Sequence, residues 1–101
     1  MKPGMDRAKR EIEELLESDE LTAGMFIRVH GDHLILARRE TEPRGGTVAG
    51  DRVRLTRLGQ SAWGLSVKRH TGRWERTPFS GNMREVMDAV WTFMQHLVAP
   101  H

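Results

Sequence analysis

The segment 25–39 limits the fold of this chain more than any other, because it has the pattern of a complete β-hairpin. Two runs rich in apolar residues, 25–30 and 33–39, flank Gly31 and Asp32. A two-residue connection that begins with glycine favours a type II′ turn, and that turn gathers the apolar side chains on one face. The residues on this face are Ile27, Val29, Leu34 and Leu36. Turn and apolar pattern predict the same register, so we expect an antiparallel sheet.

Three further strands are predicted downstream of this hairpin. They span residues 52–58, 61–70 and 73–77. A three-residue connection between the first two strands, or a bulge there, pairs Leu55 with Leu65 and keeps the apolar residues of both on the core side. A two-residue turn then leads into the last strand and places Trp74 opposite Arg69. The residues expected to face the core are Val53, Leu55, Trp63, Leu65, Val67 and Trp74.

Amphipathic helices are predicted before and after the strands. The first spans residues 6–18, with Asp6 as its cap, and has a narrow apolar stripe. The second begins at Asn82, which matches a capping box with Glu85, and ends before Pro100. The first stripe consists of Met5, Ala8, Ile12, Leu15 and Leu16. The second consists of Met83, Val86, Met87, Val90, Phe93, Met94 and Leu97.

Together these elements predict an α+β fold: an N-terminal helix, a five-stranded antiparallel β-meander and a C-terminal helix packed on the sheet, in two layers. A chain of 101 residues suits a single domain over 1–101. Residues 1–5 are expected to form a disordered tail, and the glycine-rich segment 40–51 a mobile loop. Because the chain has no cysteine and no run of about 18 apolar residues, we expect a cytoplasmic protein with no membrane partner.

Little in the sequence indicates catalysis. No nucleophile elbow or zinc-protease motif is present, and Gly45 and Gly46 lack the lysine of a phosphate-binding loop. We therefore expect no enzyme activity and no cofactor. His30 and His33 are the sharpest local pair, because the predicted turn sets them opposite each other with Cβ atoms ~5 Å apart. They could share a transition metal, with Asp32 or another residue completing the shell, but solvated strand ends beside a Gly-Asp turn are the better interpretation, because no further ligand is near in the sequence.

The small net charge of +2 hides a strong division along the chain. Residues 1–23 carry four basic and seven acidic side chains, whereas residues 51–77 carry seven basic and two acidic ones. Alternation directs several cations away from the core, on the same side as Phe26, as in sheet-based nucleic-acid readers. The nucleic-acid or anion-binding candidates are Arg28, Arg52, Arg54 and Lys68. Long cations are also ordinary cover for an exposed sheet, and the first helix could instead cover Phe26 and Ile35.

The function expected first is that of a small non-enzymatic binding domain acting through protein–protein contacts or homodimerisation. Trp91, at the rim of the last helix, and Phe26 are the partner-binding candidates, because exposed aromatic residues are enriched at interfaces. Nucleic-acid binding through the basic sheet face is the alternative. Metal binding or catalysis at His30 and His33 is the third. The choice depends on whether the first helix covers the basic face.

Overall fold

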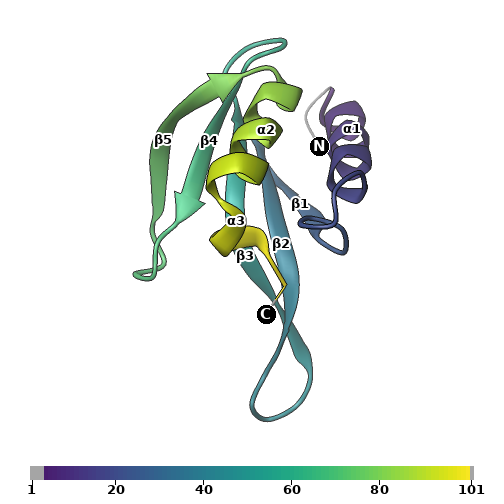
Figure 1. The fold of residues 1–101 in the computed structure, drawn as a ribbon, viewed down its shortest axis with the longest axis vertical. Coiled ribbons are helices and arrows are strands. Elements are labelled where there is room, and N and C mark those ends of the chain that lie inside the picture. Colours follow the sequence, from purple (N-terminus) through teal and green to yellow (C-terminus); the bar gives the residue numbers. More distant parts are fainter. Residues whose placement is uncertain (1–3, 101) are drawn as a thin grey trace.

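The structure, a computed structural model, describes residues 4–100. In chain order its elements are α1 (Met5–Glu17), β1 (Phe26–His30), β2 (His33–Thr41), β3 (Thr47–Arg57), β4 (Trp63–Lys68), β5 (Trp74–Gly81), α2 (Met83–Phe93) and α3 (Gln95–Val98). The strands form one antiparallel sheet in the order β1-β2-β3-β4-β5, with the helices packed on it (Figure 1). The predicted fold class is therefore confirmed. In the described part of the chain no helix is long and apolar enough to cross a membrane.

The first hairpin has the predicted register and turn. Val29 lies opposite Leu34, and Gly31 adopts a φ of 60°. No non-glycine residue in the described chain has a positive φ, so Asp32 has the negative φ of a type II′ turn. β3 and β4 also pair in the predicted register, but residues 58–62 connect them, a longer turn than the three residues expected.

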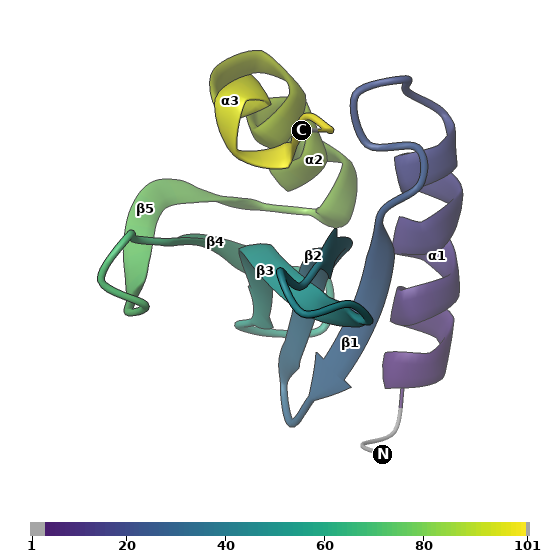
Figure 2. The same cartoon turned by 90° about the horizontal axis from the view of Figure 1, so that it is seen from below.

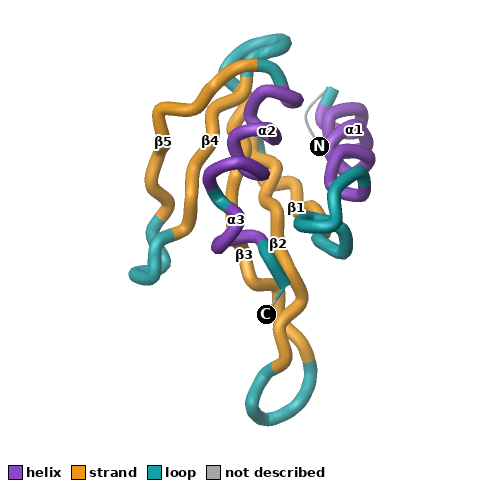
Figure 3. Tube along the Cα trace, viewed as in Figure 1, coloured by secondary structure: helices purple, strands orange, loops and turns teal. Residues whose placement is uncertain are grey.

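The segment expected to be a mobile loop, residues 40–51, is for the most part a β-hairpin. β2 extends to Thr41 and β3 begins at Thr47, so only residues 42–46 remain as a connection. The backbone N–H of Glu42 donates a hydrogen bond of 3.1 Å to the carbonyl of Gly46 across this connection. The glycines of this segment suggested a loop, but pairing between the two strands stabilises the extended backbone, and composition alone does not show such pairing. The long hairpin projects beyond the rest of the sheet (Figure 3).

α1 begins earlier than predicted. Gly4, with a φ of 85°, is its N-cap in place of Asp6. Met5 is fully buried in the core, so it does not belong to the expected tail. Residues 1–3 of that tail lie outside the described residues.

α2 begins with the predicted capping box but ends at Phe93, so that Leu97, the last residue of the predicted stripe, belongs to the separate helix α3. The Asn82 side chain accepts a hydrogen bond from the Glu85 backbone N–H at 2.8 Å, and the Glu85 carboxylate accepts one from the Asn82 N–H at 2.9 Å. At Met94 the φ of −121° separates α2 from α3. The displaced last turn is held by Arg38, which donates to the final carbonyl of α3 at 2.7 Å. A bond between residues so far apart in the sequence leaves no local pattern.

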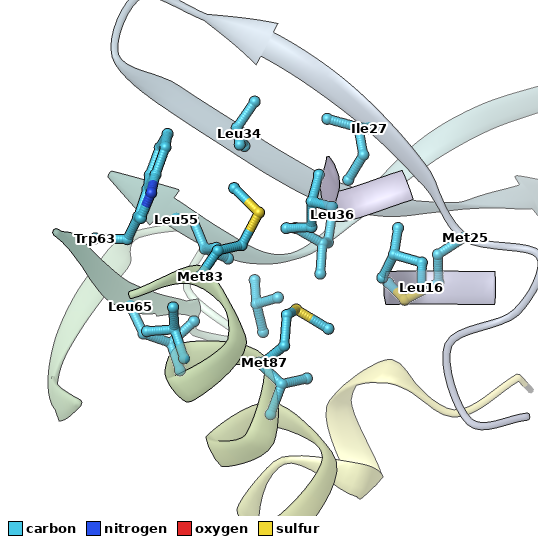
Figure 4. Close-up of a cluster of buried hydrophobic side chains, with 14 of the residues drawn as sticks. Leu16, Met25, Ile27, Leu34, Leu36, Leu55, Trp63, Leu65, Met83 and Met87 are labelled. Atoms are coloured by element: carbon cyan, nitrogen blue, oxygen red, sulfur yellow. The ribbon is translucent and has the colours of Figure 1, made fainter. Parts of the chain in front are cut away.

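All the helices pack against one face of the sheet. α1 lies beside β1 and α2 lies over β4 and β5, so that the sheet curves round the core (Figure 2). The apolar stripe of α1 and the apolar face of the first hairpin join one hydrophobic cluster with α2 (Figure 4). Its members include Ile12, Leu16, Leu34, Leu36, Leu55, Leu65 and Met87. Within residues 4–100 no helix lies on the opposite face of the sheet, so the acidic α1 does not cover the basic residues.

Candidate functional site

The helix-free side of the sheet, which we call the outer face, carries rows of side chains that cross the strands. Residues paired across antiparallel strands lie on the same side of the sheet, so the register defines these rows. The central row consists of Arg28, Ile35, Arg54, Ser66 and Arg76. On one side of it lie His30, His33, Thr56, Gly64 and Ser80. On the other side lie Phe26, Ala37 and Asp51, followed by the β4–β5 pair of Lys68 and Trp74.

Trp74 lies on the outer face and not in the core as predicted. The β4–β5 connection has five residues, 69–73, instead of a two-residue turn, and Trp74 therefore pairs with Lys68 rather than Arg69. A slip of one residue moves every side chain of a strand to the other face. Phe79 could have signalled this, because it packs against the core and its odd spacing from Trp74 predicts opposite faces in a regular strand.

Arg54 occupies the middle of the central row and reaches toward this tryptophan. Its guanidinium carbon lies 4.9 Å from the centre of the Trp74 ring. Its Nε is buried without a hydrogen-bond partner, and in the described part of the chain no carboxylate forms an ion pair with it. Burial lowers the pKa of Arg54, because removal from water disfavours the charged form. An anion arriving from outside would compensate for that lost hydration.

Asp51 is the carboxylate at the centre of the outer face, and two candidate cations share it. Arg28 donates to both of its oxygens, at 3.2 and 2.6 Å, and Lys68 Nζ lies 3.7 Å away. The Asp51 side chain is only 12% exposed. The Lys68 ammonium also lies 5.7 Å from the centre of the Trp74 ring. The structure thus brings three of the four predicted anion-binding residues together on one face.

Arg52, the fourth candidate, does not join them. A β-bulge interrupts the pairing of β2 with β3 next to it, and a bulge changes the direction in which side chains point. Arg52 pairs with Glu40 at 2.8 Å. The pKa of Arg38 is lowered first by its burial and then by the nearby charge of Arg52. Simple alternation along β3 predicted the outer face for Arg52 and was wrong, because it assumed an uninterrupted ladder.

Phe26 lies at the β1 edge of the outer face, with the Arg39 guanidinium 4.9 Å from its ring centre. It is half-buried, and α1 packs on the other side of the sheet. Ile35, between the two arginines of its row, is only 5% exposed although no helix covers it. Long arginine stems are able to cover an apolar neighbour in this way. The outer face therefore combines five cations with one ring at each edge.

The two histidines lie as the hairpin predicted, opposite each other on the outer face. Their rings are stacked with centres 6.3 Å apart, and His33 Nδ1 lies 2.8 Å from the Thr56 hydroxyl. Between residues 4 and 100, no group of three or more His, Cys, Asp or Glu side chains comes together. A transition-metal site needs more ligands than this pair supplies, so metal binding at His30 and His33 stays a prediction.

Trp91 is tied into the structure more than its predicted rim position suggested. Its indole N–H donates to the hydroxyl of the buried Thr22 at 3.1 Å, and its ring packs against the core. The exposed aromatic residue of α2 is Phe93, which is 61% exposed and stacks on Phe79 with ring centres 5.3 Å apart. The sequence pattern assigned Phe93 to the buried stripe, since it did not anticipate that the helix breaks directly after it.

Comparison with known proteins assigns no family: no family model matches the chain, and no curated protein or solved structure is significantly similar to it. Function must therefore be inferred from the geometry of the outer face.

Proposed function

We propose that this protein is a non-enzymatic binding domain whose outer face binds nucleic acid. The observation that carries the proposal is Arg54, a partly desolvated guanidinium at the centre of an uncovered face, with an aromatic ring beneath it and no carboxylate partner in the described chain. A phosphate supplies the missing anion and can accept two parallel hydrogen bonds from one guanidinium. Solvation of an exposed sheet alone explains long cations, but it does not explain a guanidinium that combines a buried, unpaired Nε with a position over an aromatic ring and no carboxylate beside it in the described chain.

The charge of the outer face supports the same assignment. Its cations are Arg28, Arg39, Arg54, Lys68 and Arg76, and Asp51 is the carboxylate among them. Such an arrangement attracts a polyanion from a distance and gives contacts that depend on salt. Trp74 and Phe26 become available for stacking with bases when the guanidinium groups of Arg54 and Arg39, which lie over these rings, turn toward phosphates. A cytoplasmic location is part of this proposal, since nucleic acid is available there, and cell fractionation tests it.

Fluorescence anisotropy with labelled random-sequence RNA and DNA, over a range of salt concentrations, tests the proposed function. Neutralisation of about three to five phosphates of a single strand gives a slope of log K against log salt between about −2 and −3.5. Arg54→Ala should weaken binding and flatten the slope by about 0.7. Arg10→Ala, on the exposed side of α1, is the matched control and should change little. No binding at low salt, or equal losses in both variants, would overturn the proposal.

Self-association is a second candidate, and the exposure of Phe93 favours it. A second copy of the chain would cover the stacked pair of Phe93 and Phe79, as apolar patches at homodimer interfaces are covered. Light scattering at increasing protein concentration, on the wild type and Phe93→Ser, tests it. A dimeric mass that the variant loses supports this role, whereas a monomeric mass at all concentrations removes it.

A further inference from the structure

We infer that the ligand is a single strand that crosses the sheet at right angles to the β-strands, with one base on Phe26 and another on Trp74. This rests on the proposed function. The first observation is the position of the two rings. Phe26 belongs to edge strand β1 and Trp74 to edge strand β5. Pairing connects Phe26 through Ala37 to Asp51 and connects Trp74 to Lys68, and the ion pair between Asp51 and Lys68 joins the two halves.

The cations lie where the backbone of such a strand would pass. Four steps between neighbouring strands of ~4.8 Å each separate the two edges, or about 19 Å along the sheet. Arg54 and Lys68 approach the Trp74 ring at one end, and Arg39 approaches the Phe26 ring at the other. Between them, Asp51 is held by Arg28 and Lys68, so its charge is countered along the path. Phosphates can therefore bind between two stacked bases.

A double helix does not fit this arrangement. Its bases are stacked on one another, so their faces are not available to aromatic side chains, whereas the bases of a single strand are. A duplex would therefore contact the cations and leave the rings unused.

Anisotropy with one oligonucleotide, as a single strand and annealed to its complement, tests this inference. Phe26→Ala and Trp74→Ala should each raise the Kd for the single strand by about 5- to 150-fold and leave duplex binding nearly unchanged. Val48→Ala, which removes an exposed apolar side chain on the other side of the sheet, is the matched control. Circular dichroism of each variant establishes that it is folded. Strands shorter than about four nucleotides should bind much more weakly, because they cannot reach both rings.

Photo-crosslinking gives a second readout that does not depend on substitution. Single strands carrying one 5-iodouracil at successive positions should crosslink to the peptide of Phe26 from one position and to that of Trp74 from another. Equal affinity for duplex and single strand, or crosslinks confined to one edge, would refute the inference while salt-dependent binding through Arg54 still stands. Absence of binding to any nucleic acid at low salt would instead overturn the proposed function.

Discussion

Asp51→Asn provides the most discriminating test of the outer face, because it should lower stability and strengthen binding at the same time. The carboxylate accepts two hydrogen bonds from Arg28 and lies 3.7 Å from the Lys68 ammonium. Asparagine keeps the shape but loses the charge. Loss of these charged contacts on a side chain only 12% exposed should cost about 1–2 kcal/mol of unfolding free energy. For a chain of this length, each kcal/mol lowers Tm by about 4–8 °C.

The same substitution releases two cations for phosphate. A phosphate that contacts Arg28 or Lys68 on the far side from Asp51 lies about 6 Å from the carboxylate, given hydrogen-bond distances on both sides. At that separation in water the two anions repel each other by about 0.7 kcal/mol. Asp51→Asn should therefore tighten single-strand binding at least about threefold at low salt. Up to two additional phosphate contacts should steepen the salt slope by about 0.7–1.4.

Thermal unfolding and anisotropy over a salt series measure both effects. Asp88→Asn is the matched control, since it changes the net charge by the same amount on α2, where Asp88 pairs with Arg84 at 3.4 Å away from the outer face. It should change neither the slope nor the affinity appreciably. Weaker or unchanged binding by folded Asp51→Asn would refute the reasoning. Equal strengthening by Asp88→Asn would show that net charge, and not the outer face, governs binding.

Three further predictions concern stability. Thr22→Val should lower the free energy of unfolding by about 1–3 kcal/mol, because it leaves the Trp91 indole N–H and a backbone carbonyl of α1 without partners. Denaturant titration should show a smaller loss of unfolding free energy from Thr22→Val when Trp91→Phe is also present. Strictly additive losses from the two substitutions would contradict the hydrogen bond. Asn82→Ala should lower the free energy of unfolding by about 1 kcal/mol through loss of the α2 cap, whereas Asn82→Ser should retain most of that stability. Equal losses of unfolding free energy in the two variants would contradict the capping role. Arg38→Met should accelerate amide exchange in α3, since Arg38 holds its last turn at Val98, and unchanged exchange there would refute that role.

Elements that depend on residues near one another in the sequence were predicted from the sequence alone. The type II′ turn at Gly31 brings its own strands into register, and the Asn82 capping box is satisfied within a single helical turn. The apolar stripe of α1 follows from helical spacing within that helix. These features, with the alternation of β3 and β4, were sufficient for the fold class. They also indicated which faces are apolar, since burial of apolar area is the main driving force.

The composition of the outer face was decided by the tertiary structure. Alternation assigns side chains to a face only when the register is known, and a turn longer than expected placed Trp74 under Arg54. A bulge between β2 and β3 separated Arg52 from the other cations. Nothing local to α1 indicates which side of the sheet it covers, because its narrow stripe can pack against any apolar surface. Local interactions in the sequence thus determined the elements, whereas contacts between distant segments determined which residues the uncovered face presents.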